Sequence, residues 1–366
     1  MCSRPMTNPQ KHRRRAVLFC AVLPFTYLRM CAIMHPKTMW KVKRMEIFNL
    51  TLSQMLMMFT LIAAGVLLRK TAVLNAHAGN IMARLETYVF VPALLLYTQM
   101  TKCTVATFVG NADIILYGFA LAAGGIALAY LLAPLFVQRG DGSAERDYQR
   151  NIYRYAMAFG NFGFMGNFLV LGVWGADVFY QYTLFTLAFY ILCYSWGLYI
   201  LVPKDRNVSL WANLKKGLLT PPIIALAVGI VLGLLNVGRF LPDFLLNALQ
   251  SAGDCQGPVA MVLAGFVIGG YNFKELLKSG KVYIATLLRL VVIPAAALLI
   301  LKAIGASDLI QTLALIVFAT PLGLNTIVYP AAYGGDTKTG ASMAMISHVL
   351  SVITIPLMYL VFIVWL

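Results

Sequence analysis

The chain has 366 residues, of which 60% are hydrophobic and only 11% are charged, and its mean hydropathy is +0.79. Soluble domains carry about 25% charged residues, so this composition excludes a soluble globular fold and indicates a polytopic membrane protein. The net charge of +16 is carried mostly by residues between hydrophobic segments. We interpret this as a topology signal rather than a nucleic-acid footprint, and we expect the lipid bilayer, not a nucleic acid, as the surrounding partner.

Residues 1–44 differ from the rest of the chain because they hold ten of the 29 Lys and Arg residues. Their apolar part is interrupted by Pro24 and Arg29. Three interpretations stay open: a signal-like segment, a weak extra span, and translated sequence upstream of the true start. The sequence Met45-Glu-Ile-Phe-Asn-Leu50 favours a membrane domain that begins at Met45, with residues 1–44 as a basic extension absent from the mature protein.

Hydropathy predicts ten membrane-spanning helices, at about 20 residues for each crossing. They cover residues 47–68, 80–99, 112–137, 155–174, 178–202, 218–236, 255–271, 282–301, 308–333 and 340–366. The expected fold class is therefore an all-α polytopic membrane protein.

The basic residues between these spans predict the orientation. One alternate set of loops and span ends holds sixteen Lys and Arg residues, with Arg289 counted among them, whereas the other holds only Lys102, Arg239 and Lys302. Because cytoplasmic loops carry the excess of positive charge, we expect the first set in the cytoplasm and both ends of the domain outside. Arginines 139, 146, 150 and 154 are expected in a cytoplasmic loop.

The ten spans divide into two sets of five. Residues 45–202 form the first set, residues 203–217 a cytoplasmic linker, and residues 218–366 the second set. An odd number of spans reverses direction, so the second set has the opposite orientation, which defines an inverted repeat. Landmarks recur in the same order in both sets: Gly65 and Gly233, Pro92 and Pro258, and Gly163 and Gly323.

Spans four and nine each contain glycine and asparagine inside an apolar run. The first cluster is Phe159-Gly-Asn-Phe-Gly-Phe-Met-Gly-Asn167, and the second is Thr320-Pro-Leu-Gly-Leu-Asn325. An unpaired backbone group in hydrocarbon costs several kcal/mol, so a helix break at membrane depth indicates a site lined by protein or water. Paired breaks in two halves of a chain point to a transporter's central binding site.

If spans four and nine cross at their breaks, each presents the N-terminus of a half-helix, whose free N–H groups favour an anion. The amides of Asn161 and Asn325 add uncharged donors and acceptors. For any single glycine, ordinary packing between membrane helices is the alternative. The candidate substrate-binding residues are Gly160, Asn161, Gly163, Asn167, Thr320, Pro321, Gly323 and Asn325.

Three ionisable residues lie within or beside the spans, where such residues are usually functional. Glu86 lies six residues before Pro92 and Asp254 four residues before Pro258, so both are candidates for a coupling proton or cation, or for the pathway. The alternatives are an ion pair of Glu86 with Arg84, and a helix cap for Asp254. His348 is expected to be a hydrogen-bonded packing residue.

Other chemistries lack their residue patterns. The six cysteines form no C-x-x-C pair, so we expect neither a disulfide framework nor a metal site. The sequence holds no His-Glu-x-x-His, no Gly-x-Ser-x-Gly and no nucleotide loop, so we expect no enzyme, no catalytic residue and no cofactor.

Several of these motifs resemble those of the auxin efflux carrier family, which includes bacterial, fungal and plant carriers. The most specific are Pro321-Leu-Gly-Leu-Asn-Thr326, Ala332-Tyr-Gly-Gly-Asp336 and Ser347-His-Val-Leu-Ser-Val-Ile-Thr-Ile-Pro-Leu357. Gly160-Asn-Phe-Gly-Phe-Met-Gly166 and Val91-Pro-Ala-Leu-Leu95 follow. The resemblance covers residues 45–366.

The resemblance implies two inverted five-helix repeats, a scaffold and a transport part, and a substrate bound where broken spans four and nine cross. It places Asn161 and Asn325 at the crossover, and it implies an organic anion such as auxin, malate or malonate. The chain departs from the family pattern at Asn167 and Phe168, where a small apolar residue and a proline usually stand. The first kink then depends on glycines, and we expect Phe168 to fill part of the pocket.

The sequence favours a secondary carrier for a small carboxylate that works by alternating access, with proton or sodium coupling left open. Because no long hydrophilic centre follows span five, we expect a short prokaryotic carrier in a bacterial plasma (inner) membrane, and a homodimer is left open. One alternative is a cation-coupled symporter resembling bile-acid carriers, for which Glu86 and Asp254 are the only candidate ligands. A non-transporting scaffold is a further alternative, but packing alone does not require paired breaks.

Overall fold

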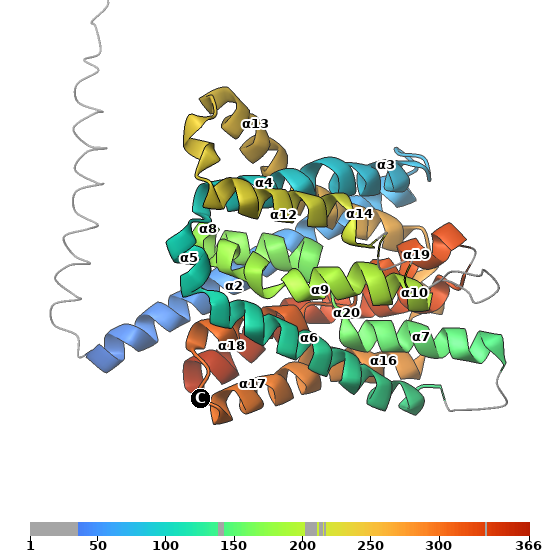
Figure 1. Ribbon diagram of the computed structural model, residues 1–366. Coiled ribbons are helices and arrows are strands. Elements are labelled where there is room, and N and C mark those ends of the chain that lie inside the picture. The colour runs from blue at the N-terminus through green and yellow to red at the C-terminus, as the bar shows by residue number, and fades with distance from the viewer. Residues whose placement is uncertain (1–35, 138–142, 202–210, 212–214, 216, 334) are drawn as a thin grey trace, which may run out of the picture. The chain divides into compact units, whose positions relative to one another are not determined.

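The computed structural model describes residues 36–137, 143–201, 211, 215, 217–333 and 335–366 (Figure 1). The chain divides into two compact units, residues 1–47 and residues 48–366. In the first unit the described residues are the start of helix α2 (Pro36–Lys70). Residues 1–35 lie outside the described residues, so the interpretations of the basic extension stay predictions. The remaining described residues belong to the second unit.

The described residues contain no β-strand, and seven of their helical segments are long and apolar enough to cross a membrane. These are Met45–Lys70, Ala78–Lys102, Ala112–Leu135, Phe162–Phe185, Asp243–Gly269, Gly280–Ala303 and Lys338–Trp365. Three shorter apolar helical segments cover Leu187–Leu201, Pro221–Leu234 and Asp308–Ala319. The expected all-helical multi-pass membrane fold is therefore confirmed.

The individual helices follow one another with short connections. The first half contains α3 (Ala78–Leu85), η1 (Glu86–Phe90), α4 (Val91–Lys102), α5 (Val105–Gly110), α6 (Ala112–Leu132), η2 (Ala133–Leu135), α7 (Ala144–Ala158), η3 (Phe162–Gly166), α8 (Asn167–Phe185), α9 (Leu187–Leu192), η4 (Cys193–Gly197) and α10 (Leu198–Leu201). The second half contains α12 (Pro221–Leu234), η5 (Val237–Phe240), α13 (Asp243–Asp254), α14 (Gln256–Gly269), α15 (Phe273–Leu276), α16 (Gly280–Leu287), η6 (Leu288–Val292), α17 (Ile293–Ala303), α18 (Asp308–Ala319), α19 (Asn325–Tyr333), α20 (Lys338–Tyr359) and η7 (Leu360–Trp365).

Helix α8 is kinked at Gly175, which has φ 78° and ψ −174°. Only glycine adopts this region readily, because it lacks a Cβ atom. The segment Phe162–Phe185 is therefore two helical pieces rather than one straight crossing. The kink lies between the predicted end of span four at residue 174 and the predicted start of span five at residue 178.

Two sets of helices pack mainly within themselves. The first set consists of the part of α2 in this unit together with α3, α4, α12, α13 and α14, and the second of α6 to α10 with α16 to α20. In Figure 1, α3, α4, α12, α13 and α14 lie in the upper part, and α6, α7, α16, α17 and α18 in the lower part. Packing partners recur between the halves of the chain, since α6 packs on α7 and α9 while α17 packs on α18 and α16 on α20.

Glycines allow the helices of the first set to touch through their backbones. A Cβ atom on Gly65 of α2 would meet the Val262 carbonyl of α14, and one on Gly265 of α14 would meet the Ile62 carbonyl of α2. In the same way, Gly233 of α12 lies against the backbone of α4. Such small-residue contacts are the usual means of close helix packing in membranes.

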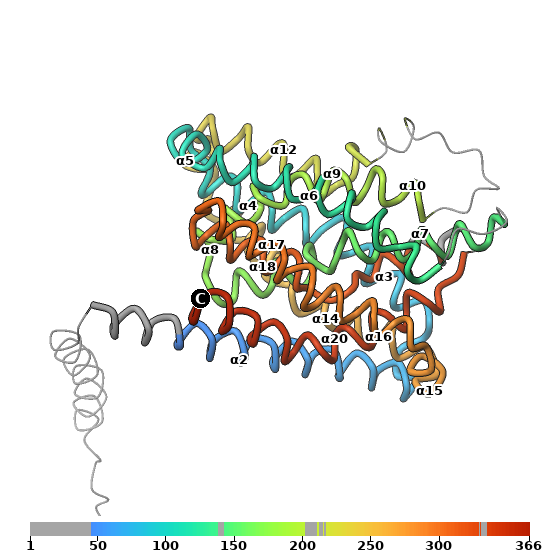
Figure 2. The backbone as a smooth tube through the Cα atoms, turned by 90° about the horizontal axis from the view of Figure 1, so that it is seen from below, coloured from blue at the N-terminus to red at the C-terminus, as the bar shows by residue number. Residues whose placement is uncertain are grey.

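The two ends of the second unit differ in charge. Figures 1 and 2 place α3, α7 and α15 at one end, and α5 and the C-terminus at the other. The basic residues around α3, α7 and α15 belong to the set that the sequence assigns to the cytoplasm. The opposite end holds the C-terminal ends of α4 and α17, with Lys102 and Lys302. The separation agrees with the predicted orientation.

Two predicted boundaries are wrong. Helix α7 begins at Ala144 rather than at residue 155, so arginines 146, 150 and 154 lie on a helix and not in a loop. Arg150 donates to the Asp147 carboxylate (2.9 Å), and Arg154 stacks on the Tyr130 ring (4.5 Å). These polar contacts stabilise the first part of α7, and a hydropathy profile does not detect them. Helix α13 precedes the predicted seventh span and was not expected, because its one apolar face is too narrow to register as a span.

Replacing Gly265 with valine should lower the melting temperature of the detergent-solubilised protein by several degrees. The added side chain collides with the α2 backbone, and overpacking costs about 1–3 kcal/mol. Gly124→Val on α6 is the matched control, because a Cβ atom there meets nothing within 4 Å. Equal melting temperatures for the two variants would contradict the close α2–α14 contact.

Candidate functional site

Both predicted helix breaks are present. Between Ala158, the last residue of α7, and Phe162, the first residue of η3, the backbone leaves helical geometry. The second break separates Ala319, the end of α18, from Asn325, the start of α19. Each break therefore ends one half-helix and starts another within an apolar segment.

The two breaks pair with each other. Gly160 forms an isolated antiparallel bridge with Leu322, and the Asn161 N–H donates to the Pro321 carbonyl at 2.7 Å. The Leu322 N–H donates to the Ser347 hydroxyl of α20 at 2.9 Å. These bonds receive backbone groups that the helices release, as is required at membrane depth.

Arg289 lies beside the paired breaks and is fully buried. Its guanidinium donates to the Met157 carbonyl at 3.0 Å and to the Val317 carbonyl at 2.9 Å. These carbonyls belong to the last turns of α7 and α18, so one cation serves the negative ends of both half-helices. A Cβ atom on Gly160 would collide with this guanidinium and with Thr320, which explains the glycine.

Arg289 is not one of the cytoplasmic loop charges with which the charge pattern groups it, and that prediction is wrong. The residue lies in η6, where the Ile293 N–H bonds to the Leu288 carbonyl five residues earlier. The next residue, Pro294, has no N–H of its own, which favours such a wide turn. The available signal was that Arg289 falls inside the predicted span 282–301, where an ionisable residue is usually functional.

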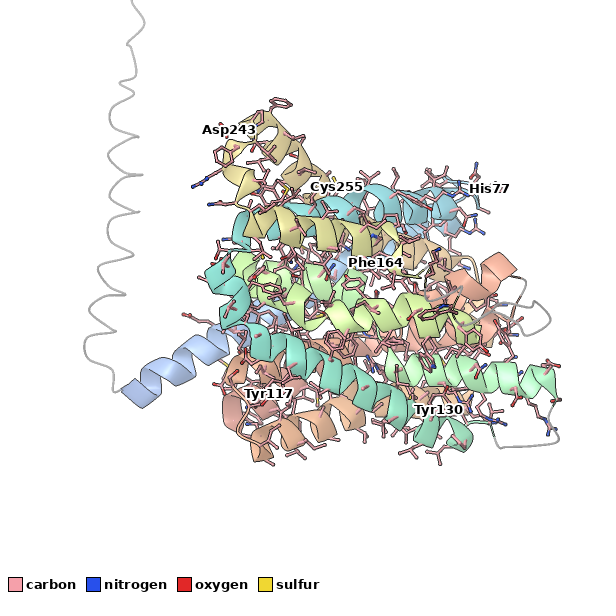
Figure 3. The ribbon with its side chains drawn as sticks, viewed as in Figure 1. His77, Tyr117, Tyr130, Phe164, Asp243 and Cys255 are labelled. Carbon is pink, nitrogen blue, oxygen red and sulfur yellow. The ribbon has the colours of Figure 1, made fainter. Side chains whose placement is uncertain are left out.

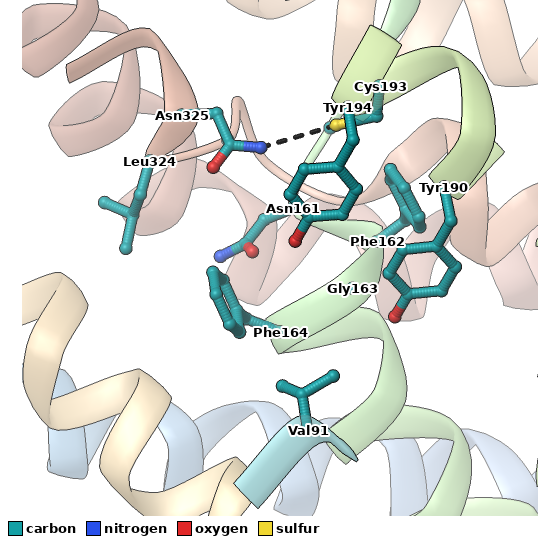
Figure 4. A pocket seen from close by; sticks show the side chains of 12 residues that line it. Val91, Asn161, Phe162, Gly163, Phe164, Tyr190, Cys193, Tyr194, Leu324 and Asn325 are labelled. Atoms are coloured by element: carbon teal, nitrogen blue, oxygen red, sulfur yellow. Dashed lines mark hydrogen bonds between the residues drawn. The ribbon is translucent and has the colours of Figure 1, made fainter. Parts of the chain in front are cut away.

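A cavity adjoins the paired breaks (Figure 4). Its void, including the open mouth, is about 400 Å³. The lining residues carry no charge, and they are Val91, Gly160, Asn161, Phe162, Gly163, Phe164, Tyr190, Cys193, Tyr194, Gly323, Leu324 and Asn325. Five of the predicted binding residues therefore meet at one place: Gly160, Asn161, Gly163, Gly323 and Asn325.

The two asparagines enter the cavity from the two breaks. The Asn325 amide donates from Nδ2 to the Tyr155 hydroxyl at 2.8 Å, and its contact with the Cys193 sulfur is 3.4 Å (Figure 4). Asn161 Nδ2 lies 3.3 Å from Nε2 of His348 on α20. Asn161 stands immediately before η3, whose first-turn N–H groups have no acceptor within the helix. Asn325 begins α19, where the Thr326, Ile327 and Val328 N–H groups donate to the Gly323 and Leu324 carbonyls.

Three predicted binding residues do not line the cavity. The Thr320 hydroxyl donates to the Val317 carbonyl at 3.1 Å, and Pro321 contributes its carbonyl to the bond with Asn161. Asn167 is buried and donates from Nδ2 to the Tyr190 hydroxyl at 3.2 Å. These residues hold the shape of the breaks and the position of Tyr190, and their direct role in binding is not supported by the geometry.

The two predicted carboxylates also lie away from the cavity. Glu86 opens η1 and is fully buried, and neither carboxylate oxygen has a hydrogen-bond partner among the described residues, so the ion pair with Arg84 is not formed. Asp254 is exposed at the end of α13, and Cys255 is the N-cap of α14. The helix-cap interpretation of Asp254 is therefore wrong, because Asp254 ends α13 and Cys255 is the N-cap of α14. A role of Asp254 in coupling or in the pathway stays a prediction.

The sequence analysis missed most of the aromatic lining. Tyr190 and Tyr194 come from the fifth span, and their rings stack at 6.4 Å between centroids. That span is rich in aromatic residues, so no local signal separated these two. Phe168, which was expected to fill part of the pocket, instead packs against Gly257 of α14, whereas Phe164 lines the cavity.

A second, larger cavity lies between α3 and α14. Its void is about 1510 Å³, and its lining includes Arg69, Arg84, Thr87, Ile327 and Val328. Thr87 precedes Val91 by one helical turn, and Ile327 follows Asn325 by two residues, so both cavities take lining residues from the same two stretches of the chain. No Asp or Glu is among its lining residues. We refer to it as the basic vestibule.

Comparison with known proteins agrees with this architecture. A family model described as membrane transport protein matches residues 50–359. The chain belongs to this family. It is the auxin efflux carrier family that the motifs in spans four and nine predict. The chain is also similar to the uncharacterized transporter MJ1031 of Methanocaldococcus jannaschii, with 26% identity over 203 residues. The alignment covers 54% of this chain and 64% of that relative, which is less than two thirds of its length.

In this membrane transport protein, Arg289→Met should cause a large loss of thermal stability. Methionine keeps much of the volume but leaves the Met157 and Val317 carbonyls without their donor, and each unsatisfied buried acceptor costs about 1–3 kcal/mol. Melting in detergent measures the effect. Arg239→Met at the opposite end of the unit is the control, and a similar loss in both variants would show that Arg289 has no special role.

Proposed function

We propose that this membrane transport protein is a secondary carrier that moves a small organic anion, such as a malate- or malonate-like carboxylate, by alternating access. The observation that carries the proposal is the cavity at the paired breaks, where Asn161 and Asn325 lie beside the starts of two half-helices. Half-helix N-termini at a midplane cavity are the usual anion sites of such carriers.

The chemistry of the cavity supports an anion. The first turn of η3 offers N–H groups of Phe162 and Gly163, and the positive end of the helix dipole points the same way. The asparagine amides donate hydrogen bonds without the desolvation that a buried lysine or arginine suffers. No carboxylate lines the cavity, so no observation favours the alternative of a cation-coupled symporter of the bile-acid-carrier type.

We infer two inverted five-helix repeats, an arrangement that would permit alternating access. The inference counts ten crossings in the described residues by separating spans four and five at Gly175 and by including the shorter apolar helices. The contact of α2 with α14 has its counterpart in that of α12 with α4, as an inverted repeat requires. The first packing set is then the scaffold and the second the transport part.

The scaffold and the transport part both contribute to the cavity, but unequally. Val91 belongs to the first packing set, whereas the other eleven lining residues belong to the second. Movement of the transport part against Val91 and its neighbours would open the cavity to one side at a time. The basic vestibule, on the side that we assign to the cytoplasm, would receive the anion. A bacterial plasma membrane is the proposed location.

Asn325→Ala should abolish anion flux while leaving expression and folding intact, because it removes an amide from the cavity without adding volume. Reconstituted vesicles with a panel of labelled mono- and dicarboxylates, with and without proton and sodium gradients, provide the measurement. Asn247→Ala on the exposed face of α13 is the matched control. Wild-type flux in the Asn325 variant would remove this residue from the site.

Arg84→Gln should raise the KM for the anion on the cytoplasmic side several-fold at low salt, with kcat little changed. An exposed charge at a cavity mouth raises the local concentration of an anion, and this effect is screened at high ionic strength. Lys278→Gln, at the same end but outside the vestibule, is the control. An equal effect from both sides of the membrane, or no dependence on salt, would argue against the vestibule as an entrance.

A further inference from the structure

The hydrogen bonds of His348 determine which of its nitrogens carries the proton. His348 lies on α20 and is only 1% exposed. Its Nδ1 atom is 2.7 Å from the Ala344 carbonyl oxygen. A carbonyl only accepts, so Nδ1 must donate, and in the neutral ring Nε2 is therefore an acceptor.

The Nε2 atom in turn determines the orientation of the Asn161 amide. The Asn161 nitrogen Nδ2 lies 3.3 Å from Nε2 and donates to it. The amide oxygen is then the end that remains for the cavity, which Asn161 lines (Figure 4). An amide oxygen repels a carboxylate. When His348 is neutral, Asn161 therefore directs its amide oxygen toward the cavity, and this oxygen does not bind an anion.

We propose that His348 is a proton-binding residue of the transport site, and that one proton is taken up with each anion. This inference rests on the proposed function. A protonated imidazole donates from both nitrogens, so Nε2–H requires the Asn161 oxygen as its partner. The amide must turn by half a rotation, and its NH₂ group then faces the cavity as a donor for the carboxylate.

Anion and proton would stabilise each other across this amide. A lone charge buried at membrane depth is expensive. Protonation of His348 without an anion is opposed further by Arg289, whose guanidinium adjoins Gly160, the residue before Asn161. Binding of the anion supplies the compensating charge and an acceptor for the turned amide. The proton therefore enters from the side to which the site is open and travels with the anion.

The other titratable groups around α20 do not offer an equivalent site. Tyr283 of α16 lines the apolar groove that His348 also borders, and Arg289 of η6 is held by carbonyls of α7 and α18. The remaining charged or titratable side chains that are described on the elements packed against α20, or on α20 itself, lie toward helix ends: Arg69 and Lys70 of α2, Lys274 and Glu275 of α15, Lys281 of α16, Asp308 of α18, and Lys338 and Tyr359 of α20.

Calorimetry on the purified full chain tests the proposal. Malonate and malate are titrated between pH 6 and 8 in buffers with different heats of ionisation, which gives the number of protons taken up for each anion bound. We expect about one proton, and an affinity that falls by up to about tenfold for each pH unit.

Two histidine variants assign the proton. His348→Gln keeps a donor and an acceptor at this position but does not titrate, so it should bind the anion with no proton uptake and a flat pH profile. His77→Gln is the matched control, because His77 is exposed in a loop, and it should behave as the wild type. His348→Asn provides the same test if the glutamine variant does not fold.

The outcomes separate this inference from the proposed function. Anion binding by the wild type without proton uptake would overturn the role of His348 alone. Proton uptake that persists in His348→Gln would place the proton elsewhere, for example on the substrate, and would also overturn it. Failure of the wild type to bind or transport any carboxylate of the panel would remove the proposed function together with this inference.

Discussion

The structure depends on how two helices can stop inside a membrane without leaving polar backbone groups unpaired. The chain solves this by pairing the two interruptions with each other, through the Gly160–Leu322 bridge and the bond from Asn161 to Pro321. Arg289 completes the arrangement, because it binds carbonyls at the ends of both preceding half-helices. The carbonyl ends are thus neutralised by the protein, while the first-turn N–H groups of η3 stay available to a ligand.

This arrangement would allow an uncharged cavity to bind the anion that we propose as substrate. The cationic group is placed where it satisfies the protein, and the ligand is left with amides and helix starts, which bind more weakly and release more readily. A carrier must release its substrate on the other side, so moderate affinity is an advantage. The cavity and the basic vestibule differ in their lining, since of the two only the basic vestibule is lined by arginine side chains.

Hydropathy and composition predicted the membrane fold, most span positions and both breaks, because these follow from local residue types. Gly160, Asn161 and Asn325 were predicted for the same reason, because glycine and asparagine inside an apolar run indicate a helix break rather than a lipid-facing helix. The role of Arg289 was not predicted, since it depends on carbonyls 132 and 28 residues away in sequence that only the tertiary fold brings together. Tyr190 and Tyr194 were missed because only tertiary packing distinguishes them from neighbouring aromatic residues, and the polar start of α7 because arginine–tyrosine contacts are invisible to hydropathy.

The contribution of Val91 as the one lining residue from the first packing set has a consequence for the energetics of crossing. An ion bound by the other eleven lining residues would keep almost all of its contacts while the second packing set moves relative to Val91. The free-energy barrier would then come from sliding the apolar contacts around Val91. It would not come from breaking and re-forming the contacts of the ion. Ion selectivity and the speed of the cycle would be set by different parts of the protein and would be free to vary separately.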